Sequence, residues 1–317
     1  MLHTLTVPSD AAGIRLDVWL ERSLDGCSRS LVKRLIDDGR CAVQPGLAKP
    51  GYPLRGGEQV TLEVPDIEPM SVEPEDLPLT VLFEDDELIV VDKAPGMVVH
   101  PAIGHARGTL VNALLGRYGR TLPDGAAWRP GLIHRLDQDT SGVICVARTP
   151  AALTAYQTMF KERLVQKRYL ALVHGAPRAD FLEHAGAIGR HPQDFRKRIV
   201  LPDGAPDAKA AYTSVVVRHR ASGYSVVEAR PKTGRTHQVR VHLAALGHPV
   251  LADGVYGRSD RWPVGADDAA PGVLRRHALH AWALRLPRPD GRDLELEAPV
   301  PADLAALVPR GIRPTAW

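Results

Sequence analysis

The stretch GLIHRLDQDTSGVICVART, residues 131–149, decides how the rest of the sequence is interpreted. It begins with a charged hexad, HRLDQD, passes through a DTSG turn and continues in the apolar run VICVA. A short continuous apolar run bounded by turn residues is typical of a buried strand. In an extended chain, Arg135, Asp137 and Asp139 would share one face. The pattern therefore predicts three charged side chains at the mouth of a buried strand.

Charge along the chain is uneven, although the net charge is only +3. Residues 1–65 carry eight basic and eight acidic side chains, whereas residues 66–92 carry ten acidic and no basic ones. Residues 93–317 carry 32 basic and 19 acidic side chains. A large basic region favours a polyanionic partner such as nucleic acid. On charge alone, a well-solvated surface without such a partner stays open.

Length and composition indicate a globular protein of the cytoplasm. The chain has 317 residues, of which 44% are hydrophobic and 24% charged, and this length allows two domains. No apolar run approaches the roughly 20 residues that span a bilayer, and no secretion signal is evident. Cys27, Cys41 and Cys145 are far apart and form no CxxC pair. They favour a reducing compartment over a disulfide framework or a cysteine-rich zinc site.

The first 65 residues show two short helical patterns followed by short strands. RLDVWLERSL has an apolar stripe at helical spacing, and SRSLVKRLIDDGR has a second one with basic side chains elsewhere. Ser28 is placed to cap the second helix and Gly39 to end it. The pattern resembles the αL RNA-binding module first known from a small-subunit ribosomal protein. The resemblance implies that residues 1–65 bind RNA, and the alternative is a helical hairpin with a solvated basic face.

Prolines and acidic residues dominate the segment after this module. Four prolines recur between positions 65 and 78, and this spacing predicts an extended linker, which we place at residues 66–80. The next stretch, LTVLFEDDELIVVDKAPG, has two apolar runs separated by EDDE and predicts a β-hairpin. We assign the remaining residues, 81–317, to one larger domain.

A helix is expected directly after the opening stretch. TPAALTAYQTMFKERLVQ begins at Thr149, and Pro150 suits the first helical position. Four residues are expected to line the inner face of this helix: Leu153, Tyr156, Phe160 and Leu164. The helix joins the strand after DTSG to the strand KRYLALV, so both strands can belong to one sheet.

Seven motifs in a fixed order resemble those of the RluA-type RNA pseudouridine synthases. The opening stretch is the central motif and matches along nearly its whole length. VDKAPGMVVHP and GTLVNALL lie before it, and KRYLALVH, KTGRTHQVRVHL, GHPVLADGVYG and ALHAWAL follow it. The seven motifs extend over about residues 85–300, which makes the resemblance specific. The departures are small, as in KAPG where the family more often has KPAG.

The resemblance implies an α+β fold: a mixed, largely antiparallel sheet with flanking helices and a central catalytic cleft, plus the N-terminal αL module. It also implies that uridines in structured RNA are isomerised to pseudouridine. In that reaction the bond from ribose to a ring nitrogen breaks, and the uracil rejoins through carbon-5. No redox change or net hydrolysis occurs, so no cofactor is required. One carboxylate has to attack the sugar, remove a sugar proton or add to the ring, and the residues leave these routes open.

By the resemblance, Asp137 is the catalytic carboxylate. A buried aspartate takes up a proton unless a cation lies beside it, and we expect Arg235, in KTGRTHQ, to be that cation. His237 and His242 lie five positions apart, and in a strand they would occupy opposite faces. We therefore expect no metal site there.

The resemblance assigns further residues to the substrate. Tyr169 is implied as an active-site tyrosine that stacks near uracil and can take the proton from carbon-5. Because a free phenol has a pKa of about 10, this step needs help, which we expect from Lys232. Arg135 is placed to enter the stack that a flipped uridine leaves, and so to offset the cost of unstacking. His134, Arg135 and Lys232 are thus expected to contact the substrate.

Other functions remain open on the sequence. A glycoside hydrolase could use Asp137 and Asp139 as its carboxylate pair, but only 5% of residues are aromatic, few for stacking on sugars. A non-catalytic RNA-binding factor in ribosome assembly is the other alternative. For a synthase, the αL module and IGRHPQDFRKRIV, residues 188–200, resemble members acting on large-subunit ribosomal RNA, with transfer RNA as the alternative. We expect a monomer whose partner is RNA, with no obligate protein partner.

Overall fold

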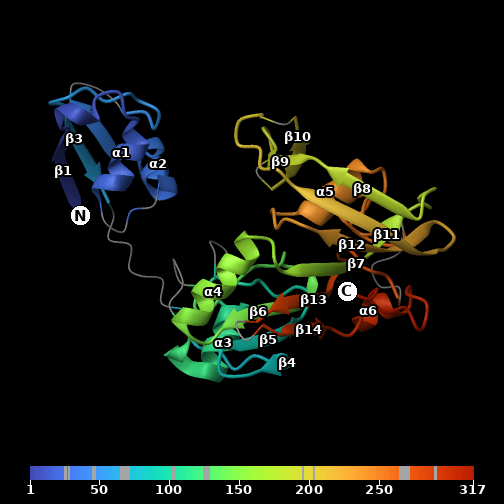
Figure 1. Cartoon of the computed structure of the whole chain (residues 1–317). Helices are drawn as coiled ribbons and strands as arrows, with labels where there is room; N and C mark the ends of the chain where they lie inside the picture. Colours follow the sequence, from blue (N-terminus) through green and yellow to red (C-terminus); the bar gives the residue numbers. More distant parts are fainter. Residues whose placement is uncertain are drawn as a thin grey trace. The chain divides into compact units, whose positions relative to one another are not determined.

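The computed structural model of the chain comprises two compact units, Met1–Ser71 and Val72–Trp317 (Figure 1). The structure describes residues 1–24, 27, 29–44, 48–64, 72–101, 105–123, 129–194, 196–202, 204–263, 272–288 and 291–317. Within these ranges, no helix is both long and apolar enough to cross a membrane.

The N-terminal unit consists of a three-stranded antiparallel sheet and two helices. Its elements are β1 (Leu2–Thr6), a 3-10 turn (Ser9–Ala11), α1 (Leu16–Ser23), α2 (Arg29–Asp37), β2 (Cys41–Gln44) and β3 (Gln59–Glu63), with strand order β1-β3-β2. The predicted apolar stripes form its core, where Leu16, Leu20 and Val32 are fully buried. Gly39 has a φ of 75° and follows the end of α2, as predicted. Ser28, the predicted N-cap, lies outside the described residues.

One nine-stranded sheet forms the framework of the second unit. Its strand order is β4-β5-β6-β13-β7-β12-β11-β8, and β14 pairs with β13. The strands are β4 (Thr80–Glu84), β5 (Leu88–Lys93), β6 (Ser141–Ala147), β7 (Gln166–His174), β8 (Phe181–Ala185), β11 (Tyr212–Arg220), β12 (Tyr224–Pro231), β13 (Leu279–Pro287) and β14 (Asp293–Glu297). In this sheet the described pairings are antiparallel, except that β13 runs parallel to β6. The predicted mixed, largely antiparallel sheet is confirmed.

Helices and a separate hairpin complete this unit. They are α3 (Leu110–Tyr118), a 3-10 turn (Gly119–Thr121), α4 (Pro150–Lys161), the hairpin of β9 (Ala187–Arg190) and β10 (Arg198–Leu201), α5 (Gln238–Ala245) and α6 (Ala302–Ala305). The predicted β4–β5 hairpin and the capped helix after Thr149 are both confirmed, since the Thr149 side chain accepts from the Ala152 N–H. The prediction that Leu164 lies on the inner face of that helix is wrong: α4 ends three residues earlier, and Leu164 is 50% exposed.

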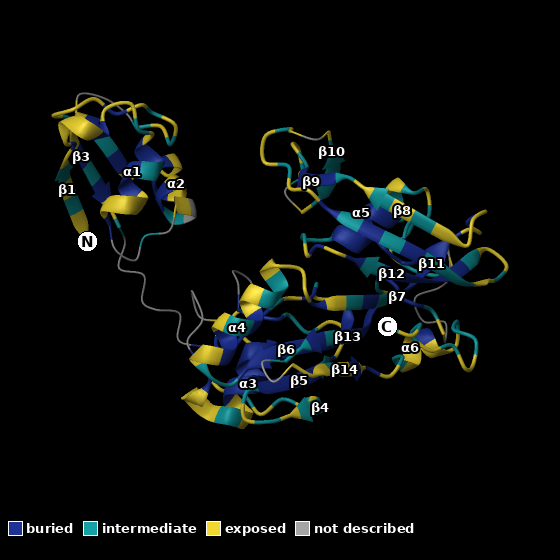
Figure 2. Ribbon diagram, in the orientation of Figure 1, coloured by how far each residue is buried: buried dark blue, intermediate teal, exposed yellow. Residues whose placement is uncertain are grey.

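Burial on both faces of β6 explains its continuous apolar run (Figure 2). Ile144 and Val146 pack in the cluster that contains α3, whereas Val143 and Cys145 pack in the cluster that contains α4. Because successive strand residues point to opposite faces, a strand covered on both sides is apolar at every position. The segment that precedes β6 is therefore anchored at its downstream end in a rigid core.

Gly142 lets β6 begin directly beside β13. Its φ is 110°, and a Cβ at this position would lie 2.2 Å from the carbonyl oxygen of Ala281. A side chain here would push the two strands apart. The close approach fixes where the chain after Thr140 enters the sheet.

Only part of the stretch that we assigned to a linker, 66–80, is described by the structure, and that part packs on the larger unit. Residues 65–71 lie outside the described residues, whereas Val72 is buried. Asn112 of α3 donates from its side chain to the carbonyl of Glu73 at 2.8 Å. From residue 72 onward the chain is thus held against the larger unit.

Candidate active site

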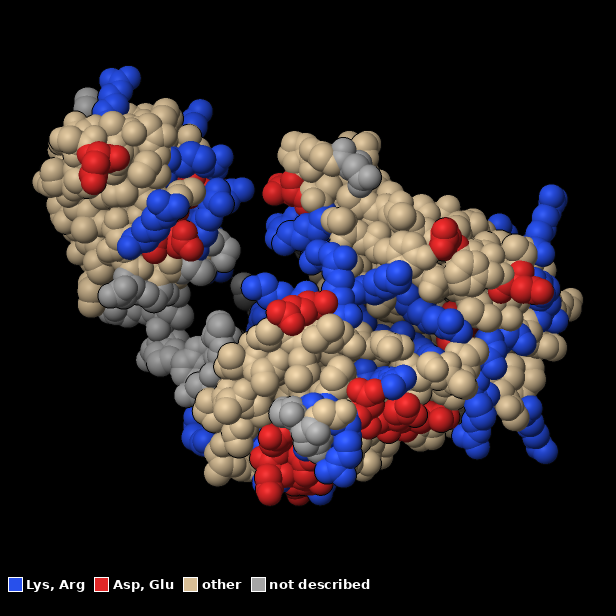
Figure 3. Space-filling view, viewed as in Figure 1, with Lys and Arg blue, Asp and Glu red and all other residues tan. Residues whose placement is uncertain are grey.

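A pocket of about 440 Å³ opens in the second unit where the segment before β6, the start of β7 and the turn before α5 meet. Asp137 is the one acidic residue among its described lining. Its Lys and Arg residues are Arg135, Lys161, Arg163, Lys167, Arg235 and Arg240. Figure 3 shows basic side chains running across the middle of this unit, between α4 and the β9–β10 hairpin. The size suits a nucleotide base, and the excess positive charge suits a polyanion.

Asp137 lies at the end of an extended segment, directly before a turn. The N–H of Thr140 donates to the Asp137 carbonyl at 3.1 Å and closes this turn over Gln138 and Asp139. The turn breaks the alternation of an extended chain, so the prediction that Asp139 shares a face with Arg135 and Asp137 is wrong. Asp139 does not line the pocket, and its carbonyl accepts from Arg276 at 2.9 Å.

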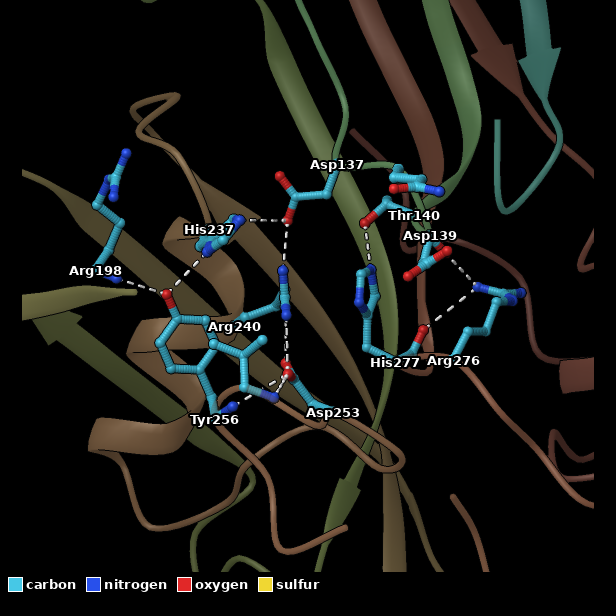
Figure 4. Close-up of polar contacts among 12 residues, drawn as sticks. Asp137, Asp139, Thr140, Arg198, His237, Arg240, Asp253, Tyr256, Arg276 and His277 are labelled. Carbon is cyan, nitrogen blue, oxygen red and sulfur yellow. Dashed lines mark hydrogen bonds and ion pairs between the residues drawn. The ribbon is translucent and has the colours of Figure 1, made fainter. Parts of the chain in front are cut away.

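The cation that pairs with Asp137 is Arg240 of α5 (Figure 4). Its Nη1 donates to Asp137 Oδ2 at 3.0 Å. Its Nε and Nη2 donate to the two carboxylate oxygens of Asp253 at 2.7 and 2.8 Å. Arg240 is 5% exposed and Asp253 1% exposed, so one buried guanidinium holds two carboxylates. Such bidentate and charge-assisted hydrogen bonds fix geometry as well as charge.

Arg235 does not fill the role that we predicted for it. It lines the pocket, but its Nε donates to the Ala210 carbonyl at 3.3 Å. The reason is local: the chain leaves β12 at Pro231 and forms a turn, and α5 begins only at Gln238. Arg235 lies in this turn and donates to Ala210, whereas Arg240 lies in the first turn of the helix and reaches Asp137.

The pKa of Asp137 lies below the ordinary value for aspartate. Burial acts to raise this pKa, but His237 and Arg240 lower it more, together with the hydrogen bond from Arg240. His237 Nε2 lies 3.9 Å from the same Oδ2 that Arg240 holds. Within the described part of the chain, Oδ1 has no hydrogen-bond partner. The site thus offers an ionised carboxylate with one oxygen anchored and one free.

Tyr169 and Lys167 lie two positions apart on β7 and both line the pocket. Burial, and then the charge of Asp137, raise the pKa of the Tyr169 phenol well above its ordinary value. The phenol is therefore protonated at neutral pH. Burial lowers the pKa of Lys167 to about 8, and its Nζ donates to the Thr233 carbonyl at 3.1 Å.

Lys232 does not lie where we predicted the helper of Tyr169. Its Nζ is 4.6 Å from the centroid of the Tyr212 ring, and it does not line the pocket. Lys232 is exposed in the turn after β12, and its ammonium lies over the Tyr212 ring instead. The pocket lysine that shares strand β7 with Tyr169 is Lys167.

Arg135 and His134 are neighbours in the sequence with different surroundings. Arg135 is exposed at the pocket and has no hydrogen bond or ion pair within the described ranges. His134 forms part of the pocket wall. Its Nε2 accepts from the Cys145 N–H at 2.9 Å, and its ring stacks on the Phe160 ring with the two centroids 4.7 Å apart. Burial lowers the pKa of His134 to about 3, so its ring is neutral. Arg135 thus has a free guanidinium at the pocket, whereas His134 lines it without a charge.

His237 and His242 are not strand residues, because the chain from Gln238 is helical. His242 is fully buried, with Nδ1 2.9 Å from Thr213 Oγ1 and Nε2 3.2 Å from the Gly186 carbonyl oxygen. His237 precedes α5 and faces the pocket. Over the described ranges, no group of three or more His, Cys, Asp or Glu residues could hold a metal ion.

Four residues at this site were not predicted from the sequence: Lys167, Arg240, Asp253 and Tyr256, whose hydroxyl lies 2.8 Å from His237 Nδ1. The stretch QVRVHL alternates apolar and polar residues like a strand, and this alternation hid the helix that carries Arg240. A helical signal was present, since Val239 and Leu243 are four residues apart and both buried. Asp253 lies in the motif GHPVLADGVYG, but nothing in that motif alone points to Arg240.

Comparison with known proteins supports a common function for this arrangement. The model of the RNA pseudouridylate synthase family matches residues 87–245, and the S4 domain model matches residues 14–60. A protein of Xanthomonas campestris pv. campestris named ribosomal large subunit pseudouridine synthase D is 42% identical over 311 residues, covering 97% of this chain and 92% of that protein. The protein of the same name from Escherichia coli O157:H7 is 38% identical over 310 residues, covering 96% and 93%.

A solved structure agrees with these sequence matches. The structure of human RNA pseudouridylate synthase domain containing 1 covers 74% of this chain and 86% of its own, with a TM-score of 0.55 and 32% identity. The family match spans the pocket from Asp137 to Arg240, and relatives match along nearly the whole chain. The chain belongs to the RNA pseudouridylate synthase family, whose members are isomerases, and it carries an S4 domain at its N-terminus.

Proposed function

We propose that this protein isomerises specific uridines of large-subunit ribosomal RNA to pseudouridine and that Asp137 is the catalytic carboxylate. The observation that carries the proposal is the ionised Asp137, paired with the buried Arg240 inside a pocket whose other charged residues are basic. The choice of ribosomal RNA rests on the relatives named ribosomal large subunit pseudouridine synthase D, which match along nearly their whole length.

The free oxygen of Asp137 performs the chemistry in this proposal. Arg240 holds Oδ2, and Oδ1 is left to attack the ribose, to remove a sugar proton or to add to the ring. Each route needs the ionised carboxylate, which Arg240 maintains. When the bond to the ring nitrogen breaks, negative charge develops on the uracil, and the cations of the pocket stabilise it.

Arg135 and Tyr169 handle the base. A uridine inside a helix or loop has to leave its stack, at a cost on the order of a few kcal/mol. The exposed guanidinium of Arg135 enters the vacated stack and contacts phosphate, which offsets this cost. Tyr169 stacks on the uracil as a neutral phenol. Lys167 takes the helper role that we first gave to Lys232: because its pKa is lowered to about 8, its unprotonated amine can accept the phenol proton while Tyr169 takes the proton that carbon-5 loses.

The S4 domain supplies affinity in this scheme. Lys33 and Arg34 are exposed on α2, where phosphate groups can reach them. The residues proposed for chemistry all lie in the second unit. Binding and chemistry are therefore assigned to separate units of the chain.

The variant Asp137→Asn tests the proposal, with Asp139→Asn as the matched control. The amide keeps the size of the side chain but removes its charge and its basic oxygen. We expect turnover to vanish in Asp137→Asn, with folding and RNA binding retained, and to stay within a few-fold in Asp139→Asn. The assay is tritium release from carbon-5-labelled uridine, with large-subunit ribosomal RNA and transfer RNA as parallel substrates, beside a melting curve and a binding isotherm. Substantial tritium release by a folded Asp137→Asn enzyme contradicts the mechanism, and release from transfer RNA alone contradicts the substrate.

A further inference from the structure

A row of polar contacts leads from the β9–β10 hairpin to Asp137 (Figure 4). The backbone N–H of Arg198, in β10, donates to the Tyr256 hydroxyl at 2.8 Å. That hydroxyl lies 2.8 Å from His237 Nδ1, and His237 Nε2 lies 3.9 Å from Asp137 Oδ2. The imidazole thus stands between a phenol and the proposed catalytic carboxylate, with one ring nitrogen toward each.

The hydroxyl of Tyr256 decides which nitrogen of His237 carries the proton. Its oxygen already accepts from the Arg198 N–H, and its own proton needs an acceptor. Within the described residues, His237 Nδ1 is the acceptor in reach. A neutral imidazole that accepts at Nδ1 carries its proton on Nε2. The Nε2–H then points at Asp137, so the ring presents a donor and not a lone pair to the carboxylate.

His237 is neutral in this environment. Burial lowers its pKa most, Arg240 and Arg198 lower it further, and Asp137 and Asp253 act in the opposite direction. The net pKa lies below the ordinary value for histidine, so the ring carries one proton at neutral pH. The backbone of His237 is also unusual, with a φ of 58°. A left-handed non-glycine residue costs energy and is found where the surrounding structure needs its side chain in one place.

We propose that Tyr256 is a positioning residue that sets the tautomer of His237, and that His237 gives the carboxylate of Asp137 a second donor beside Arg240. At 3.9 Å the contact is electrostatic, and an approach of about 1 Å makes it a hydrogen bond. Contacts of this kind tighten when substrate binds. Because both donors act on Oδ2, Oδ1 stays free to react. The inference rests on the proposed role of Asp137.

The first test reads the tautomer directly, without activity. Long-range proton–nitrogen NMR of the full-length protein labelled with 15N-histidine distinguishes the two neutral tautomers, and His237→Gln identifies the signals of His237. We expect the Nε2–H form in the wild type and a mixed or Nδ1–H form in Tyr256→Phe. Tyr224→Phe is the matched control, since it loses a phenol that donates elsewhere, to the Leu307 carbonyl at 3.0 Å. An Nδ1–H tautomer in the wild type, or an unchanged tautomer in Tyr256→Phe, overturns the inference.

The second test measures turnover, and its result can be told apart from a failure of the proposed function. Without the Tyr256 hydroxyl, the Nε2–H of His237 is no longer held toward Asp137. Single-turnover rates in Tyr256→Phe should therefore fall roughly tenfold, which corresponds to about 1.4 kcal/mol. The acid limb of the pH profile should move to higher pH, because the ionised form of Asp137 loses a donor, while KM for RNA is unchanged. His237→Gln, whose amide can accept from Tyr256 and donate to Asp137, should retain more activity than His237→Leu. Equal rates and pH profiles for Tyr256→Phe and wild type refute the positioning role, whereas an active Asp137→Asn refutes the proposed function instead.

Discussion

Replacing Arg240 by Gln should destabilise the second unit and reverse part of the pH dependence of its stability. Arg240 makes three charge-assisted hydrogen bonds of 2.7–3.0 Å to two carboxylates, and it is 5% exposed. Breaking a buried ion pair by removing one partner costs about 3–5 kcal/mol, because the other partner stays buried and unpaired. For a unit of this size that corresponds to a fall in Tm of about 6–20 °C.

The sign of the pH effect follows from the pKa values of the two partners. In the wild type, the pKa values of Asp137 and Asp253 are both lowered. The two ionised carboxylates therefore stabilise the folded state above the unfolded pKa of about 3.9, and this stabilisation is lost as the pH falls below that value. Without Arg240, burial dominates and raises both values. The folded state then binds protons more readily than the unfolded state, so lowering the pH from neutral should stabilise Arg240→Gln. Activity should fall with the loss of ionised Asp137 and recover partly at high pH.

Thermal and urea unfolding between pH 4 and pH 8 measure these effects. Arg285→Gln is the control, since Arg285 pairs with Asp293 at the surface, where an ion pair is worth at most about 1 kcal/mol. Adding Asp253→Asn to Arg240→Gln should recover part of the lost stability, because one unpaired charge disappears. A loss below about 1 kcal/mol in Arg240→Gln, or no recovery in the double variant, would refute the reasoning about this buried arginine.

Two further variants test the division of labour in the chain. Removing residues 1–71 should weaken binding to structured RNA and reduce the dependence of that affinity on salt, with turnover at saturating RNA retained. Binding isotherms at several salt concentrations measure the first effect. A folded truncation that is inactive at saturating RNA would contradict this division of labour. Arg135→Ala should lower kcat/KM for RNA roughly tenfold without changing the melting temperature, because its exposed guanidinium contributes to flipping and not to folding. A 2-aminopurine placed beside the target uridine reports flipping, and the same signal for Arg135→Ala and wild type would contradict the proposed entry of Arg135 into the vacated stack.

Local patterns in the sequence were sufficient for the elements near Asp137. The apolar run VICVA predicted β6, and the Thr149–Pro150 start predicted α4, because burial and capping act within a few residues. The predicted turn at DTSG, residues 139–142, lies slightly earlier in the structure, over Gln138 and Asp139, and β6 already begins at Ser141. A turn of this kind ends the two-residue alternation on which the predicted direction of Asp139 rested.

The partner of Asp137 could not be predicted because it depends on contacts between distant segments. Arg235 and Arg240 lie in the same motif, and only the start of α5 at Gln238 decides which of them reaches the carboxylate. Asp253 and Tyr256 come from a later segment and act on α5 and on His237. No spacing within one motif reveals such a pairing, since tertiary packing determines it.

The central position of β13 has a consequence for the newly synthesised chain. This strand lies between β6 and β7, which precede it by more than a hundred residues and carry the Asp137 loop and Tyr169. Until residues 279–287 have left the ribosome, β6 and β7 lack the strand that pairs with both of them and joins them in one sheet. The RNA-binding unit, with its own core, ends at Ser71. At 5–20 residues per second, the nascent chain therefore spends roughly 10–40 s able to hold RNA before it can modify it.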